Sequence, residues 1–246
     1  MKRNPFNPLR RLSAFRLPAS ALLFLLALAP LAGAQQQQSP PVEAGTFRQP
    51  DLVELVKLDR TLRLDIRYAT ANNFTGRRVY REARAFLQRP AAQALVRVNR
   101  ALRKKGYTLL IFDGYRPWHV TKLFWDITPE DKKQFVADPS RGSRHNRGCA
   151  VDVSLFDLRT RREVSMPSPY DDFTERAHIN YTGGTDEQRR LRDLLRAAME
   201  AEHFRVYEPE WWHYDFDGWR EYPILNLSFS EIRRSNQRSA ISSQPE

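Results

Sequence analysis

The spacing of hydrophobic positions predicts both strands and helices in the middle of the chain. Residues 62–68 alternate hydrophobic and charged side chains, and this period of two predicts a half-buried strand. Residues 91–105 instead place hydrophobic side chains three and four positions apart, which predicts an amphipathic helix that stops at Gly106. Residues 108–112 form a largely hydrophobic run of the kind found in buried strands.

Capping signals predict two more helices. Thr128 followed by Pro129 is the pattern of an N-cap and a first helical residue, so we expect a short helix to begin there. Thr185 and Gln188 have the spacing of a capping box, which predicts a helix that continues to about Glu202.

Turn residues mark two further strands. Gly148 supplies a turn ahead of a hydrophobic strand over residues 149–155, and the aromatic residues after Pro209 favour a strand over a helix. Strands and helices follow one another without a regular βαβ repeat. We therefore expect one α+β domain.

The two ends of the chain differ in composition from this domain. Residues 1–34 combine a basic leader, a hydrophobic run over residues 19–31 and a small-residue cleavage site, which predicts a secretory signal peptide cut before Gln35. An uncleaved anchor is the alternative, although the run is shorter than the roughly 20 residues of a membrane span. Residues 35–50 resemble a flexible linker and residues 233–246 a polar tail. The domain is then 51–232.

Export would also change the charge and limit the ways of stabilising the fold. The leader carries five basic residues and no acidic one, so its removal lowers the formal net charge from +11 to +6. The remaining basic residues are interspersed with acidic ones, which argues against a nucleic-acid partner. Cys149 is the single cysteine, so no intramolecular disulfide can form. We expect a periplasmic or secreted protein that is not stably inserted in the membrane once the signal is cleaved. Without a disulfide, its stability must come from the hydrophobic core.

Candidate chemistry begins at His145 and Asp152. Asp152 lies inside a hydrophobic strand, where a carboxylate is costly unless it is paired, hydrogen-bonded or bound to a metal. The plain alternative is an Asp on a polar face of the sheet. The six residues between the two leave room for a turn that brings both side chains to one cation.

A second candidate pair, Glu210 and His213, lies among aromatic residues. In a regular strand, residues three apart point to opposite faces, so Glu210 must sit on a bend if both serve one site. Alone, a histidine among aromatics is more often a satisfied core residue than a ligand. Two histidines and one carboxylate are a ligand set found in catalytic zinc sites, and a neighbouring carboxylate can act as the general base. Arg116, just after a buried strand, could stabilise charge on a carbonyl oxygen or form an ordinary ion pair.

These segments resemble the D-alanyl-D-alanine dipeptidases of the M15 metallopeptidase family. Ser143–Asp152 carries an S-x-H-x-x-G-x-A-x-D motif and Glu210–His213 an E-x-W-H motif, both of which occur across the wider family. Three other segments are similar to the dipeptidase branch in particular. They are residues 68–76, 113–117 and 170–178.

The resemblance implies a role for each matching residue. It implies one zinc ion held by His145, Asp152 and His213, with Glu210 as the catalytic base and Arg116 facing the tetrahedral intermediate.

For the substrate, the resemblance implies a small D,D-dipeptide. Ser143 would lie near its carboxylate and Asp171 near its free amine, and Tyr68 would also contact it. The implied fold is a small antiparallel sheet flanked by helices, of the D,D-peptidase or hedgehog type. The sequence indicates no oligomeric state.

Three other functions compete with this one. A D,D-carboxypeptidase of the same family would act on longer peptidoglycan stem peptides. A non-haem iron oxygenase also uses two histidines and one carboxylate, but it needs no base in the position of Glu210. A non-catalytic wall-binding module would have lost a ligand or the base, whereas this sequence keeps both.

Overall fold

The computed structural model of the chain describes residues 39–242, with side chains described as far as Ser235. The predicted signal peptide, residues 1–34, lies outside the described residues. Between residues 39 and 242, no helix combines the length and hydrophobicity that a membrane crossing requires.

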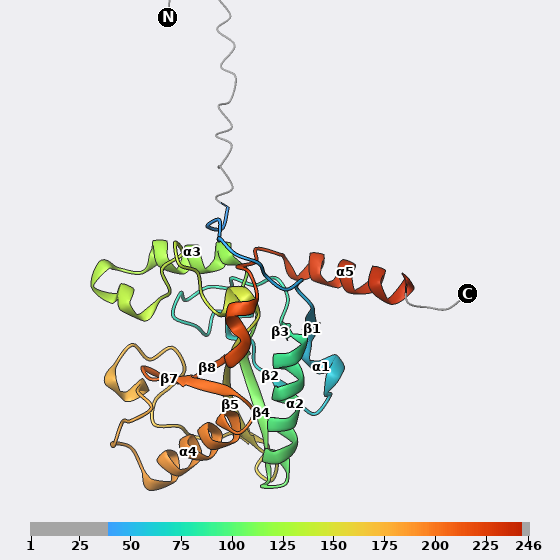
Figure 1. Ribbon diagram of the computed structural model, residues 1–246. Coiled ribbons are helices and arrows are strands. Elements are labelled where there is room, and N and C mark those ends of the chain that lie inside the picture. The colour runs from blue at the N-terminus through green and yellow to red at the C-terminus, as the bar shows by residue number, and fades with distance from the viewer. Residues whose placement is uncertain (1–38, 243–246) are drawn as a thin grey trace, which may run out of the picture. The chain divides into compact units, whose positions relative to one another are not determined.

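A six-stranded sheet forms the centre of the domain, in the order β2-β4-β5-β8-β7 with β6 paired to β5 (Figure 1). The strands are β2 (Arg63–Leu64), β4 (Tyr107–Asp113), β5 (Ala150–Asp157), β6 (Arg162–Glu163), β7 (Phe204–Tyr207) and β8 (Glu210–Phe216). Strand β2 runs parallel to β4, and the other described pairs in this sheet are antiparallel. The sheet is therefore antiparallel, as expected, except at this edge, where β2 makes it mixed. A separate antiparallel pair joins β1 (Leu52–Glu54) to β3 (Phe86–Gln88).

Two long helices cover one face of the sheet. The α-helices are α1 (Leu55–Leu58), α2 (Arg89–Arg103), α3 (Trp118–Ile127), α4 (Asp186–Glu200) and α5 (Phe229–Ser242). Short 3-10 helices are η1 (Arg67–Ala69), η2 (Glu130–Phe135), η3 (His145–Arg147), η4 (Glu175–Ala177) and η5 (Asp217–Glu221). Helix α2 packs on β4, α4 packs on β5, β7 and β8, and the two helices touch each other (Figure 1). An α+β domain was expected, and the mixed sheet with helices confirms it.

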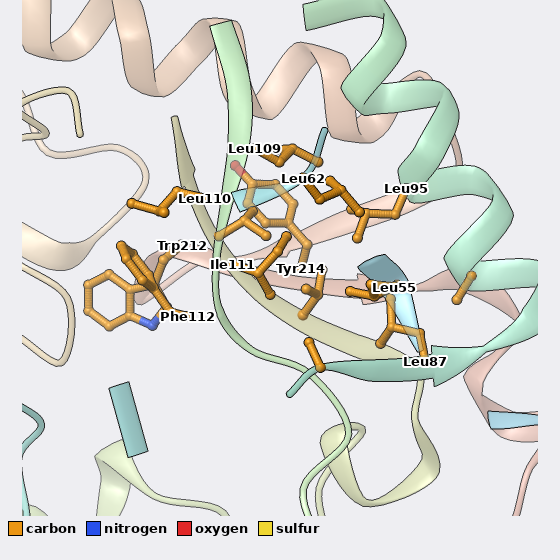
Figure 2. Packing of buried hydrophobic residues seen from close by; sticks show 14 of the residues in the cluster. Leu55, Leu62, Leu87, Leu95, Leu109, Leu110, Ile111, Phe112, Trp212 and Tyr214 are labelled. Atoms are coloured by element: carbon orange, nitrogen blue, oxygen red, sulfur yellow. The ribbon is translucent and has the colours of Figure 1, made fainter. Parts of the chain in front are cut away.

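Hydrophobic side chains on both faces of β4 fill the core. Figure 2 shows Leu109 and Ile111 directed toward Leu95 of α2, whereas Leu110 and Phe112 point to the opposite side of the strand. Leu95, Leu109, Ile111 and Phe112 are fully buried. Burying one such side chain contributes roughly 1.5–3 kcal/mol, so this layer supplies much of the stability of the domain.

The helix and the long strands predicted from periodicity are confirmed. Helix α2 ends at Arg103, and Gly106 follows with a φ of 88° that favours glycine. Its hydrophobic stripe, including Leu95 and Leu102, is fully buried. The strand predicted over residues 62–68 is shorter than expected. Only β2 pairs in the ladder, and the 3-10 turn η1 ends the predicted stretch. Leu62, Ile66 and Tyr68 are buried as expected, and Leu64 is partly buried.

The capping predictions have opposite outcomes. Thr185 and Gln188 form the predicted capping box at the start of α4. Thr128 is not an N-cap, so that prediction was wrong. Its hydroxyl donates to the carbonyl oxygen of Phe124 at 2.7 Å and closes the end of α3, while Pro129 precedes η2. A threonine between two helical segments can cap either one, and here the preceding carbonyl is the partner.

The chain ends of the domain make defined contacts. Within the segment predicted as a linker, the Glu43 carboxylate pairs with Arg147 and accepts the backbone N–H of Ile224. Helix α5 continues to Ser242, through residues predicted as a polar tail.

Candidate metal centre and active site

Two backbone features bring the candidate ligands together. Gly148 adopts a left-handed conformation, with a φ of 69°, that turns the chain from η3 into β5 and sets His145 above the strand. In the sheet, Asp152 of β5 pairs directly with His213 of β8. Paired residues of neighbouring strands project to the same face, so the carboxylate and the imidazole lie side by side.

The ligand atoms of these residues form a nearly equilateral triangle. His145 Nε2 lies 3.1 Å from His213 Nδ1, which lies 3.1 Å from Asp152 Oδ1, and His145 Nε2 lies 3.3 Å from the same oxygen. Among the described residues, this is the group of histidine, cysteine and acidic side chains that could hold a metal ion.

Hydrogen bonds on the outer side of each imidazole hold it in one orientation. His145 Nδ1 lies 2.7 Å from the carbonyl oxygen of Gly114, and His213 Nε2 lies 2.9 Å from Asp215 Oδ1. Because these oxygens can only accept, the outer nitrogens carry the hydrogens. In the neutral form of each imidazole, the inner nitrogen then turns a lone pair toward the triangle, as a metal ligand must.

The donor set fits a small divalent cation. In a tetrahedral site with bonds of 2.0–2.1 Å, neighbouring ligand atoms are about 3.3 Å apart, close to the observed triangle. Burial alone would lower the pKa of His213, but the carboxylates of Asp215 and Asp152 raise it well above its usual range. The site therefore attracts positive charge, which a bound cation would supply.

Glu210 lies beside the triangle. Its Oε2 is 3.8 Å from His213 Nδ1. The ladder between β7 and β8 shifts register after Val206, and both Trp212 and His213 line the pocket although they are consecutive. Glu210 and His213 were expected to share one site only if the chain bends between them. This bend is the irregularity within β8. Burial, together with the nearby charge of Asp152, raises the pKa of Glu210 to about 7.

Arg116 reaches the same pocket, and a buried carboxylate holds it in place. Asp113 Oδ2 accepts from Arg116 Nε at 2.9 Å, and the Tyr80 hydroxyl donates to the other Asp113 oxygen at 3.0 Å. The guanidinium stacks over the Phe124 ring, 4.9 Å from its centroid, and its Nη2 lies 3.7 Å from Asp152 Oδ2. An exposed ion pair was the alternative for Arg116, but the side chain is buried against the candidate site.

Tyr68 and Asp171 meet at another part of the pocket. The Tyr68 hydroxyl lies 3.2 Å from Asp171 Oδ1, and the backbone N–H of Phe74 donates to Oδ2 at 3.3 Å. Asp171 has a positive φ of 58°, a conformation that an aspartate adopts more readily than most residues. Burial and the negative charge of Asp152 raise the pKa of Asp171 to about 8.

Ser143 completes the set of predicted residues. Its side-chain oxygen accepts the backbone N–H of His145 at 3.2 Å. One cavity of about 150 Å³ is lined by all eight predicted site residues, which are Tyr68, Arg116, Ser143, His145, Asp152, Asp171, Glu210 and His213. The structure thus brings together residues that lie far apart in the sequence.

Sequence reasoning did not assign a role to Asp215, Tyr170 or Asp113, each of which holds a site residue. Tyr170 donates to Asp152 Oδ2 at 2.9 Å. Asp215 could have been found, because it lies two residues after His213 in a strand and so shares its face. The part played by Tyr170 depends on a loop path that no local pattern reveals.

Comparisons with known proteins identify the family. A family model described as D-ala-D-ala dipeptidase matches residues 48–232. A D-alanyl-D-alanine dipeptidase of Escherichia coli (strain K12) is 33% identical over 180 residues, which cover 73% of this chain and 92% of the relative. One from Enterococcus faecium is 34% identical over 186 residues, covering 68% of this chain and 91% of the relative.

Solved structures give more distant matches. One described as VanYB in complex with D-Alanine-D-Alanine aligns with a TM-score of 0.37 and 15% identity, over 65% of this chain and 85% of that chain. On the family match and on the two relatives, the chain belongs to the D-alanyl-D-alanine dipeptidase family of M15 peptidases.

Proposed function

We propose that this protein is a zinc-dependent dipeptidase that hydrolyses D-alanyl-D-alanine to two D-alanines. The observation that carries the proposal is the triangle of His145, Asp152 and His213 donor atoms, with the Glu210 carboxylate beside it in one pocket. Both relatives described above bear the name of this activity.

Zinc suits the donor set, since two imidazoles and one carboxylate leave a fourth position open. Bound there, zinc would polarise the peptide carbonyl and lower the pKa of water from 15.7 to about 7. His145, Asp152 and His213 would hold the ion, and Gly114 and Asp215 would keep the two imidazoles in the required orientation.

Glu210 is assigned as the general base. A carboxylate with a pKa of about 7 can accept the proton of the attacking water near neutral pH and later donate it to the leaving amine. Its 3.8 Å separation from His213 Nδ1 keeps it close to the attacking water without making it one of the three ligands.

Arg116 is assigned to the developing negative charge on the carbonyl oxygen. Asp113 and the rings of Tyr68 and Phe124 hold the guanidinium, so little reorganisation is needed when charge develops. Loss of one such preorganised donor typically costs roughly 3–4 kcal/mol in the barrier.

The remaining polar residues suit the two ends of a free dipeptide. Asp171 would bind the ammonium group with Tyr68 beside it, and Ser143 would lie near the carboxylate. An ammonium group would also favour the charged form of Asp171, which burial disfavours in the empty pocket. The cavity of about 150 Å³ has room for several water molecules, as the site of a small ligand requires.

The test is an assay of zinc-loaded protein on D-alanyl-D-alanine and on an N-acylated stem peptide, with a chelated control. We expect hydrolysis of the free dipeptide and its loss after chelation. Preference for the blocked peptide would instead establish the D,D-carboxypeptidase activity. Metal analysis together with oxygen uptake separates both from an iron oxygenase, because the triangle alone fits either metal.

We further propose that the protein is exported and works on dipeptide derived from the cell wall. Support comes from the signal-peptide pattern of residues 1–34. The mature protein should begin at Gln35, which N-terminal sequencing of protein from the periplasm or medium would show.

A further inference from the structure

Two aromatic side chains separate the catalytic pocket from a second cavity. Phe74 and Phe173 line both the pocket that holds the metal-ligand triangle and an outer groove of about 480 Å³. The groove is also lined by Arg77, Ile127 and Lys132, and none of the predicted site residues borders it. The two rings thus form the wall between the two spaces, which we call the aromatic partition.

A row of ring contacts leads from the catalytic arginine to this partition. Arg116 lies over the Phe124 ring, and the centroid of Phe124 is 5.0 Å from that of Phe74. Phe74 lies 5.4 Å from Phe173, which stacks on Phe135 at 5.0 Å with an interplanar angle of 4°. The row places Phe173 and Phe135 at the end remote from Arg116.

The aromatic partition adjoins the residue assigned to the substrate amine. The backbone N–H of Phe74 donates to Asp171 Oδ2, and Phe173 follows Asp171 by two positions in the chain. A dipeptide whose amine pairs with Asp171 would therefore have its amino end beside Phe74 and Phe173, which also border the outer groove.

We propose that Phe74 and Phe173 are specificity-determining residues that close the pocket beyond the substrate amine and exclude peptides extended or acylated at that end. This inference rests on the proposed function. It adds a steric cause of dipeptide selectivity to the electrostatic one. Asp171 favours a free ammonium group through its charge, and the two rings would exclude a group larger than that ammonium. With the partition opened, an added group would extend into the outer groove.

Phe173 is the residue to change, because it is partly exposed and lies outside the hydrophobic core of the described residues. Phe173→Ala removes one of the two rings of the aromatic partition but keeps Asp171, Phe74 and the backbone donor of Phe74. The probe is N-acetyl-D-alanyl-D-alanine, measured as a competitive inhibitor of D-alanyl-D-alanine hydrolysis and as a substrate. Phe156→Ala, another partly buried ring but on β5 and not among the pocket residues, is the matched control.

We expect the inhibition constant of the acetylated dipeptide to fall about tenfold or more in Phe173→Ala, the usual effect of opening a pocket to a small group. It should fall less in Phe135→Ala, which removes the stacking partner of Phe173 and another ring that lines the pocket but leaves both rings of the aromatic partition, and stay unchanged in Phe156→Ala. Inhibition constants within twofold of wild type in both pocket variants would overturn the inference. Failure of the proposed function looks different, since wild-type protein would then not cleave the free dipeptide at all.

Discussion

At β5 and β8, the two faces of the central sheet bury different kinds of side chain. The face toward α2 buries hydrophobic side chains such as Leu109, Ile111 and Val153. The other face, only one residue away along the same strands, buries Asp152 and His213. Hydrophobic groups gain from burial alone, whereas buried charged groups need partners in defined positions. The first face is therefore expected to stabilise the fold and the second to carry the chemistry.

The largest effect should follow from the base on the site face. Glu210→Gln keeps the shape of the side chain but cannot accept a proton, so we expect turnover to fall by about 10²- to 10⁴-fold. Bound zinc, measured by metal analysis, should stay near one per chain. Glu208→Gln, in the exposed turn just before, is the control and should keep wild-type activity. Near-normal turnover in Glu210→Gln would refute the assigned base.

A change on the face toward α2 should lower stability but leave turnover unchanged, the reverse of the effect expected for Glu210→Gln. Leu95→Ala leaves a cavity under α2, which should lower the free energy of unfolding by about 2–5 kcal/mol. Denaturant titration measures the loss, while turnover per folded molecule should be unchanged. Leu58→Ala, at an exposed position of α1, should change stability by less than about 0.5 kcal/mol. A large loss of turnover in folded Leu95→Ala would mean that the two faces are not separable.

An intermediate effect is expected from the carboxylate behind His213. Asp215→Asn weakens the bond that orients the imidazole, so metal affinity should fall by about 10- to 100-fold. Competition with a fluorescent chelator would measure this directly. The control is Asp217→Asn, an exposed position two residues further along that pairs with Arg205. Equal affinity in Asp215→Asn and wild type would show that the imidazole needs no such support.

The smallest effect is a change in stability at Asp171. Burial disfavours the charged carboxylate there, whereas binding of an ammonium group would require it. The pKa of Asp171 is about 8 in the folded protein and about 3.9 in an unfolded chain. Between these values only the folded state holds the proton, so this group makes the protein less stable as pH rises from about 4 to 8.

Asp171→Asn removes that penalty. The variant should gain about 1.4 kcal/mol relative to wild type as the pH rises from 5 to 6, since across that unit only the folded wild-type chain holds the extra proton. Thermal unfolding at the two pH values checks the sign. An equal gain in stability at the two pH values would contradict a raised pKa for the buried carboxyl group of Asp171.

The residues that could be predicted are those whose roles depend on local spacing. The helix ending before Gly106 and the capping box at Thr185 follow from periodicity and short-range hydrogen bonds, and recognisable motifs assigned Asp152 and His213 to one site, although their pairing across two strands was not predicted. Thr128 was misassigned because two helical segments compete for one hydroxyl. The aromatic partition and the bond from Tyr170 to Asp152 arise where distant loops meet, and no local pattern encodes such meetings.

The donor triangle also joins parts of the chain that are distant in sequence. His145 and His213 are separated by 68 positions, and β5 and β8 meet through Asp152 and His213. By mass action, an ion that binds only the folded chain stabilises it by about 1.4 kcal/mol for each tenfold rise in free ion above the dissociation constant. With zinc as the proposed ion, the equilibrium stability of the folded chain, and with it resistance to proteases that cut the unfolded chain, should follow the free zinc of its surroundings.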